Sequence, residues 1–158
     1  MKITIITVGK VKEKYLIDGI KEYAKRLKKY TKLEFIEVKD EQAPENLSAK
    51  DIKIIKSKEA ERIINKLPES YLISLAIEGD EITSLDLAKK IEDIKTYSNS
   101  HITFLIGGSL GLSDELKRKS NYLLSFSKMT FPHQLMKMIL LEQLYRSFRI
   151  NNNEPYHK

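Results

Sequence analysis

Short runs of β-branched and apolar residues alternate along the chain with longer stretches in which apolar residues recur at helical spacing. The short runs predict five strands, at residues 2–8, 33–38, 71–77, 102–106 and 122–126. The fourth run, ITFLI, is apolar throughout, which is typical of a parallel strand covered on both faces. This order of elements predicts an α/β fold with a mainly parallel sheet and helices on both faces.

The stretches between the strands predict helices at residues 14–30, 48–66, 83 or 84 to 96, a short one from 113, and 134–150. In the last helix the apolar residues surround the axis instead of forming one stripe: Leu135, Met136, Met138, Ile139, Leu140, Leu141, Leu144 and Tyr145. A helix that is apolar on all sides must be covered on all sides. We expect the sheet to cover one side and a second copy, in a homodimer, to cover another, although deep burial in a monomer would satisfy the same pattern.

The composition is that of an ordinary globular protein, with 41% hydrophobic and 32% charged residues. A length of 158 residues suits a single domain, which we expect to span 1–158. The absence of cysteine excludes disulfides and thiolate metal sites, and it fits a reducing compartment. No secretion signal is evident, and no apolar stretch reaches the roughly 18 residues of a membrane span. We therefore expect a cytoplasmic protein without a membrane segment.

Positive charge is concentrated at the two ends of the chain, whose formal net charge is +6. Residues 1–32 hold ten Lys or Arg against three acidic residues, and residues 121–158 hold five against two. The segment between them holds thirteen against seventeen and is therefore acidic. This distribution favours a polyanionic partner, because Lys and Arg displace counterions from phosphates. The solvated faces of a lysine-rich protein explain it equally well.

The glycines best placed to contact a ligand follow the fourth predicted strand, as Gly107-Gly108-x-x-Gly111. They match neither the G-x-G-x-x-G dinucleotide motif nor the P-loop, which requires a following Lys. A plain strand-to-helix turn explains them, but so does close approach of the backbone to a ligand at the carboxyl ends of parallel strands. The segment 124–134 (LSFSKMTFPHQ) is expected to emerge beside this turn. We therefore expect one pocket between the two segments.

Few side chains suit acid–base or metal chemistry. His133 lies near the start of the last helix, where it is either a proton acceptor or a capping residue, and His101 opens a strand and is interpreted as structural. No group of His, Asp and Glu has the spacing of a metal site, and no nucleophile elbow is present. Hydrolysis and metal catalysis are therefore not expected, and neither is a bound metal.

Two further surfaces suit contact with RNA. Lysines three, four or seven positions apart are expected along one face of the first helix, where they bind phosphate or are simply solvated: Lys14, Lys21, Lys25, Lys28 and Lys32. On the last helix, Glu142 shares a face with Arg146 and Arg149 and can pair with Arg146. The tail Tyr156-His157-Lys158 can stack on and hydrogen-bond an unpaired base, unless it is frayed.

These motifs together resemble the ribosomal RNA large subunit methyltransferase H family. The resemblance rests on the glycine turn 106–112 (IGGSLGL), the segment 124–133, the run 142–146 (EQLYR), the ending 155–158 (PYHK) and the opening 1–10. It covers essentially the whole chain. It implies a SPOUT-type α/β fold with a C-terminal trefoil knot, an arrangement that the general avoidance of knots would not suggest.

The resemblance also implies a homodimer and a site for S-adenosylmethionine. By motif, the donor would contact Leu75, Gly107, Phe126, Ser127, Lys128, Met129, Thr130 and Phe131. Near the target it implies Arg146, Tyr156 and His157. The reaction needs a proton acceptor, and we expect His157 or His133 to serve as one, with Arg146 stabilising the negative charge.

The activity that the resemblance implies is methylation of N3 of a pseudouridine in 23S rRNA within the assembled ribosome. Three rival interpretations are kept beside this one. They are a methyltransferase of this fold that acts on another RNA position, a noncatalytic basic RNA-binding module, and a nucleotide-binding regulator built around the glycine turn. The missing P-loop lysine argues against the last.

Overall fold

The computed structural model describes residues 1–158 and contains one five-stranded sheet in the order β2-β1-β4-β3-β5. The strands are β1 (Lys2–Val8), β2 (Lys32–Val38), β3 (Tyr71–Glu81), β4 (His101–Ile106) and β5 (Tyr122–Ser125). Every neighbouring pair is parallel, so the carboxyl ends of all five strands lie at one edge of the sheet. The predicted parallel sheet is confirmed.

Five helices connect and follow the strands: α1 (Lys14–Leu27), α2 (Ala49–Ile64), α3 (Ser84–Tyr97), α4 (Asp114–Lys119) and α5 (His133–Asn151). Reciprocal capping boxes fix the starts of α2 and α3. The Ser48 hydroxyl accepts from the Asp51 N–H while the Asp51 carboxylate accepts from the Ser48 N–H, and Thr83 and Asp86 do the same. These local signals explain why both helix starts were predictable from the sequence.

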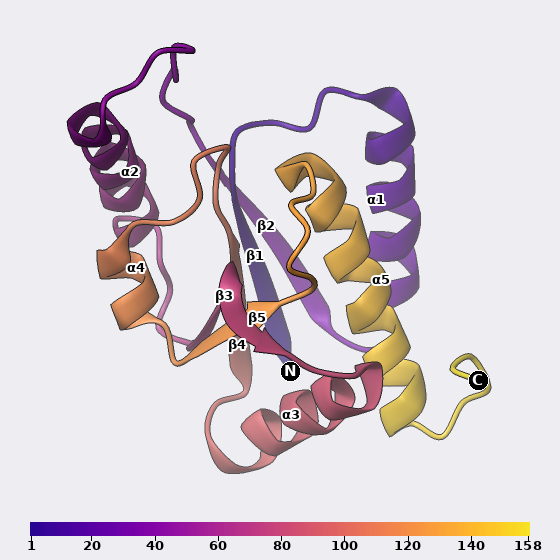
Figure 1. Ribbon diagram of the computed structural model, residues 1–158. Coiled ribbons are helices and arrows are strands. Elements are labelled where there is room, and N and C mark those ends of the chain that lie inside the picture. The colour runs from indigo at the N-terminus through magenta and orange to yellow at the C-terminus, as the bar shows by residue number, and fades with distance from the viewer.

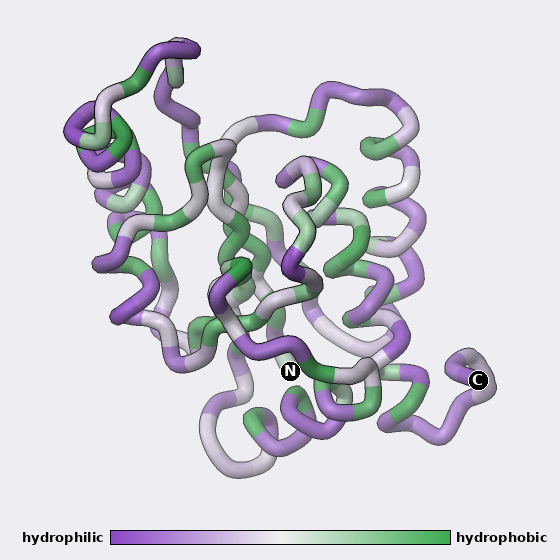
Figure 2. Tube along the Cα trace, viewed as in Figure 1, coloured by the Kyte–Doolittle hydropathy of each residue, from purple (hydrophilic) through white to green (hydrophobic).

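The helices cover both faces of the sheet, as predicted. α1, α3 and α5 pack on one face, and α2 and α4 pack on the other (Figure 1). Consecutive strand residues point to opposite faces, so Phe104 belongs to the core under α5 while Leu105 belongs to the core under α2. Figure 2 shows the most hydrophobic segments along the central strands, with hydrophilic segments on the outer helices.

β3 is longer than predicted and is interrupted by a bulge. Both Leu75 and Asp80 pair with Leu124 of β5, so residues 76–79 between them have no partner in the sheet. Gly79 passes close to β5, and a Cβ atom at this position would lie 2.7 Å from the carbonyl carbon and oxygen of Leu123. The pattern of apolar residues gave no sign of this bulge, because it depends on contact with a strand that is distant in sequence.

α1 ends earlier than the sequence predicted. The helix ends at Leu27, and Lys32 is the first residue of β2, so the predicted stripe of five lysines on one helix is wrong at Lys32. The amide of Tyr30 bonds to the Leu27 carbonyl in a turn, and the Tyr30 ring stacks on Phe148 of α5 at 5.7 Å. Packing against α5 therefore replaces the last helical turn that local propensity favoured.

α5 buries one side of its apolar surface within the chain. Leu140, Leu141 and Leu144 are fully buried against the sheet, α1 and α3, whereas Leu135 and Ile139 are only half-buried. No helix combines the length and the apolar character needed to cross a membrane.

Candidate active site

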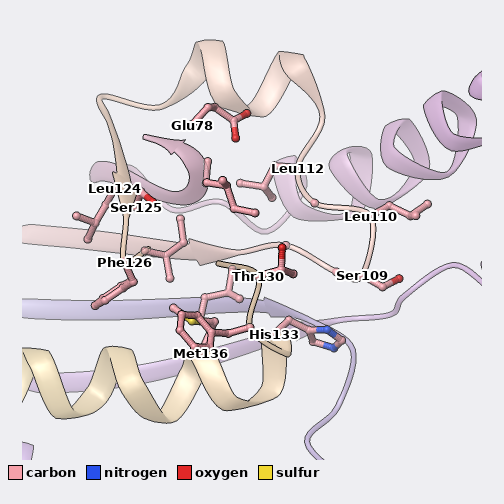
Figure 3. A pocket seen from close by; sticks show the side chains of 18 of the residues that line it. Glu78, Ser109, Leu110, Leu112, Leu124, Ser125, Phe126, Thr130, His133 and Met136 are labelled. Atoms are coloured by element: carbon pink, nitrogen blue, oxygen red, sulfur yellow. The ribbon is translucent and has the colours of Figure 1, made fainter. Parts of the chain in front are cut away.

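A pocket lies at the carboxyl edge of the sheet, between α4 and the start of α5. It has a volume of about 730 Å³, within the range of small-molecule sites. Three segments line it: residues 75–78 of the β3 bulge, the glycine turn 106–112 and the loop 124–133. The expected convergence of the glycine turn with the loop after β5 is confirmed. Figure 3 shows Glu78 and Leu112 on one side of this pocket and Phe126 and Met136 on the other.

The glycine turn presents bare backbone to the pocket. Gly111 adopts φ +81°, a conformation that side chains disfavour, and its amide donates to the Gly108 carbonyl at 3.0 Å. A Cβ atom on Gly107 would lie 2.9 Å from Leu112 Cδ2, and one on Gly108 would lie 3.2 Å from the Glu59 carboxylate. Neighbouring atoms therefore pack closely against Gly107 and Gly108 and leave little room for a side chain at either position.

The loop after β5 closes the other side. Ser125 donates to the Ser127 carbonyl at 3.1 Å, and the Ser127 hydroxyl accepts from the Met129 amide at 3.0 Å. The loop carries two exposed apolar side chains at the rim, Met129 and Phe131, which are 74% and 37% exposed. Ile77 of the bulge is 51% exposed at the same rim. Three large apolar side chains therefore stand exposed at the mouth of the pocket.

Charged groups line the pocket wall opposite the loop. Glu78 of the bulge pairs with Lys117 of α4, and this contact lowers the pKa of Glu78 below its ordinary value. The carboxylate therefore stays ionised at neutral pH. Lys56 of α2 also lines the pocket. The wall thus offers both a carboxylate and ammonium groups to a ligand that carries charges.

A buried carboxylate lies next to Gly108 of the glycine turn. Glu59 of α2 is 6% exposed, and its Oε2 accepts from the Glu41 amide at 3.0 Å. Burial is the main cause that raises the pKa of Glu59. His133, the first residue of α5, lines the pocket rim with its Nε2 near Gly9 at the end of β1. Glu59 and His133 therefore lie at adjacent positions along the carboxyl edge of the sheet.

The residues predicted to bind the donor fall at this pocket with one exception. The lining includes Leu75, Gly107, Phe126, Ser127, Met129, Thr130 and Phe131. Lys128 is exposed and does not line the pocket.

The residues predicted to lie near the target form a second cluster at the other end of α5. The Arg146 guanidinium lies 4.7 Å from the centre of the Tyr156 ring and 3.3 Å from His157 Nδ1, and it pairs with Glu142 at 2.7 Å. The predicted Glu142–Arg146 pair is confirmed. The pocket residues His133 and Met136 precede Arg146 by thirteen and ten positions on one helix, so about 15–20 Å separates the pocket from this cluster.

Comparison with known proteins identifies the family. A family model described as a predicted SPOUT methyltransferase matches residues 1–157. Proteins named ribosomal RNA large subunit methyltransferase H, from Clostridioides difficile (strain 630) and Shouchella clausii (strain KSM-K16), are 58% and 60% identical to this chain. Both alignments cover 100% of each chain. The chain belongs to the ribosomal RNA large subunit methyltransferase H family of SPOUT methyltransferases.

Solved structures support the SPOUT methyltransferase fold at lower identity. A probable methylase family protein from Haemophilus influenzae Rd KW20 superposes with a TM-score of 0.53 at 17% identity, covering 99% of this chain and 70% of that one. A putative methylase family protein from Neisseria gonorrhoeae gives a TM-score of 0.51 at 14% identity, over 99% and 86% of the two chains. The threading of a C-terminal knot stays a prediction of the family resemblance.

Sequence reasoning missed several residues of this SPOUT methyltransferase pocket. Ala76, Ile77 and Glu78 enter it only because of the bulge, and Glu59 reaches the glycine turn from a helix near the middle of the chain. The one local signal was Gly79, which lies two residues after the predicted strand 71–77, because a glycine beside a strand pattern can mark a bulge. No group of three or more His, Asp or Glu residues is arranged to hold a metal ion.

Proposed function

We propose that this chain transfers a methyl group from S-adenosylmethionine to N3 of a pseudouridine in 23S rRNA, acting as a homodimer on assembled ribosomes in the cytoplasm. One observation carries the proposal. The glycine turn and the loop after β5, which hold the family's motifs, line one pocket in a chain that matches ribosomal RNA large subunit methyltransferases over its full length. We further propose that residues 1–158 form one domain that contains the SPOUT knot.

The pocket residues fit the proposed donor. The pocket's volume of about 730 Å³ suits a nucleoside with an amino-acid chain, and about half of the residues that line the pocket are hydrophobic. Phe126 and Leu75 offer apolar surfaces for a base, while the backbone of the glycine turn can approach closely at Gly107. When bound, S-adenosylmethionine would supply an electrophilic methyl group on a sulfonium sulfur. Holding that methyl group in line with the acceptor can contribute about 7–11 kcal/mol to lowering the barrier.

The second cluster of residues is suited to the target base. Tyr156 offers a ring for stacking, and the exposed His157 offers a hydrogen-bonding edge. A pseudouridine N3 carries a proton that must leave as the nitrogen takes up the methyl group. Arg146 has no acceptor atoms, so at the 3.3 Å contact it donates to His157 Nδ1. The proton of a neutral His157 ring then lies on Nε2, which makes this histidine a hydrogen-bond donor to the base while the contact lasts.

This tautomer makes His133, at the pocket rim, the better placed of the two candidate proton acceptors. Arg146 would stabilise negative charge on the base once N3 has lost its proton. Replacing His133 by Asn tests the assignment in single-turnover methylation, because an Asn cannot accept a proton but keeps a polar side chain. A His133→Asn enzyme that transfers methyl at the wild-type rate would remove His133 from the mechanism.

The separation of about 15–20 Å along α5 between the pocket and Arg146 supports a homodimer. One chain cannot bring its own Arg146, Tyr156 and His157 to its own donor pocket without unfolding α5. A second copy can bring its cluster to this pocket if the two chains pack with their α5 helices in opposite directions. The exposed apolar residues Met129, Phe131 and Ile77 at the rim supply the surface that such a copy would cover.

Methyl transfer to ribosomes tests the function. Ribosomes with and without the pseudouridine would be incubated with the enzyme and S-adenosylmethionine, and the 23S rRNA would be digested and mapped by mass spectrometry. We expect one methyl group, on the pseudouridine, only in the modified ribosomes. A methyl group elsewhere would favour the alternative of another RNA position. No transfer and no heat of binding with S-adenosylmethionine would favour a noncatalytic RNA-binding module.

Mixing two inactive variants tests the shared site. Thr130→Trp would fill the donor pocket from an exposed position, and Arg146→Ala would remove the target-side cation. In a mixed dimer one of the two sites has neither substitution, so random reassociation should restore about a quarter of the wild-type activity. If each site were built from a single chain, the mixture would stay inactive.

A further inference from the structure

The C-terminal tail turns back over α5 through a defined helix cap. The Glu154 amide donates to the Arg149 carbonyl at 2.9 Å and the Asn153 amide donates to the Ile150 carbonyl at 3.0 Å, which is the bond pattern of a Schellman motif. Asn153 supplies the left-handed residue that this motif needs, with φ +54°. Asn tolerates this conformation better than most residues. The tail is therefore directed back along the helix and does not continue outward from its end.

One carboxylate then fastens the tail to α1 and α5. Glu154 accepts from the Tyr30 hydroxyl at 2.5 Å and from the Lys29 ammonium at 3.1 Å, and it also pairs with Arg149. The Tyr30 and Lys29 bonds are the main causes that lower the pKa of Glu154. Arg149 makes a further contact with the tail, from Nη2 to the Pro155 carbonyl at 3.1 Å. We call these four side chains, Glu154, Arg149, Tyr30 and Lys29, the tail clamp.

The tail clamp holds the segment immediately before the target-side residues. Two residues after Glu154, the Tyr156 ring meets the Tyr145 ring edge-on at 4.9 Å, and its hydroxyl donates to Glu142 at 3.1 Å. The Arg149 Nε is buried without a hydrogen-bond partner, which costs free energy. The hydrogen bonds of this guanidinium come from its two Nη atoms, which contact Glu154, the Pro155 carbonyl and the Tyr30 hydroxyl, so the tail and Tyr30 together maintain the orientation of Arg149.

We propose that the tail clamp is a positioning device for methyl transfer, in which Glu154 and Arg149 fix the tail so that Tyr156 and His157 are in place before RNA binds. The proposal rests on the proposed function, because it assigns the tail to the RNA substrate. An ordered tail loses less conformational freedom on binding than a frayed one, and catalytic geometry is sensitive to displacements of about 1 Å. Glu154 and Arg149 need not touch the substrate for this purpose.

Two variants weaken the tail clamp with little change in the shape of the side chain. Glu154→Gln keeps the size of the side chain and removes its charge, and Tyr30→Phe removes one hydroxyl but keeps the ring that stacks on Phe148. The matched control is Glu92→Gln, which breaks an exposed pair with Lys95 on α3, far from the tail. Carboxypeptidase digestion followed by mass spectrometry reports the release of Lys158, His157 and Tyr156. Single-turnover methylation of ribosomes measures methyl transfer, and calorimetry with S-adenosylmethionine measures binding of the donor.

We expect Glu154→Gln to speed tail release and to lower kcat/KM for ribosomes by about tenfold to a hundredfold, while the Kd for S-adenosylmethionine changes by less than about twofold. Glu154→Asp should restore part of the activity, and Tyr30→Phe should show a smaller loss of the same kind. Wild-type tail release in both variants would overturn the proposal. So would a loosened tail with undiminished transfer, or a parallel loss of transfer, donor affinity and Tm.

The experiments distinguish a wrong proposal for the tail clamp from a wrong proposal for the function. If the wild-type protein transfers no methyl group to ribosomes, the proposed function fails, whereas the digestion assay still measures the clamp. If Glu154→Gln does not fold, Tyr30→Phe carries the same test through the loss of a single hydroxyl.

Discussion

Gly79 lies where the bulge of β3 crosses β5, and replacing it by alanine is expected to damage both the fold and the donor pocket. The added Cβ would lie 2.7 Å from the carbonyl carbon and oxygen of Leu123 and 2.9 Å from the carbonyl carbon of Leu124. All three atoms belong to the backbone of β5, so no side-chain rotation can relieve the contact. Either the bulge or the edge strand must move.

The magnitude follows from the cost of overpacking. Forcing a methyl group into closed space typically costs about 1–3 kcal/mol. For a chain of this size each kcal/mol shifts the Tm by about 2–4 °C, so we expect the Tm to fall by roughly 2–12 °C. Because Ile77 and Glu78 in the same bulge line the pocket, the Kd for S-adenosylmethionine should rise by at least about tenfold.

Calorimetry measures both effects on one sample, by thermal unfolding and by titration with the donor. Gly19→Ala is the control, because the atom nearest to its new Cβ is the flexible Met138 sulfur, and alanine is about 0.5–1 kcal/mol better than glycine inside a helix. Its Tm should be unchanged or higher. A Gly79→Ala protein with the wild-type Tm and donor affinity would refute the argument that the bulge is closely packed and shapes the pocket.

Two further predictions concern a buried acid and a helix cap. Burial raises the pKa of Glu59, so the folded protein holds that proton more tightly than the unfolded chain, and the ionised side chain destabilises the fold above its folded pKa. Glu59→Gln should therefore raise the Tm at neutral pH, and thermal scans at successively lower pH should show this gain shrinking; a gain independent of pH would contradict the assignment. Ser48→Ala removes the capping box with Asp51 at the start of α2 and should lower the Tm by about 2–4 °C without changing donor affinity, which would not hold if α2 were anchored by its buried face alone.

The site was partly predictable, because the two segments that form it carry local signals. The glycines after β4 and the Pro-His sequence at the start of α5 both follow strand patterns, and parallel strands bring their carboxyl ends to one edge. Pattern reasoning alone gave a pocket for an unspecified ligand. The donor and the target base came only from the resemblance of motifs, since no charge pattern distinguishes a methyl donor from another small molecule.

The sequence by itself determined the order and approximate bounds of strands and helices, the parallel sheet and its coverage on both faces, because hydrophobic periodicity and capping residues act within a few positions. Only the tertiary structure decided the order β2-β1-β4-β3-β5, the bulge that adds Glu78 to the pocket, and the tail clamp. Those features depend on packing between distant segments: Tyr30 and Glu154 are 124 positions apart, and no local pattern specifies which distant group a side chain will meet.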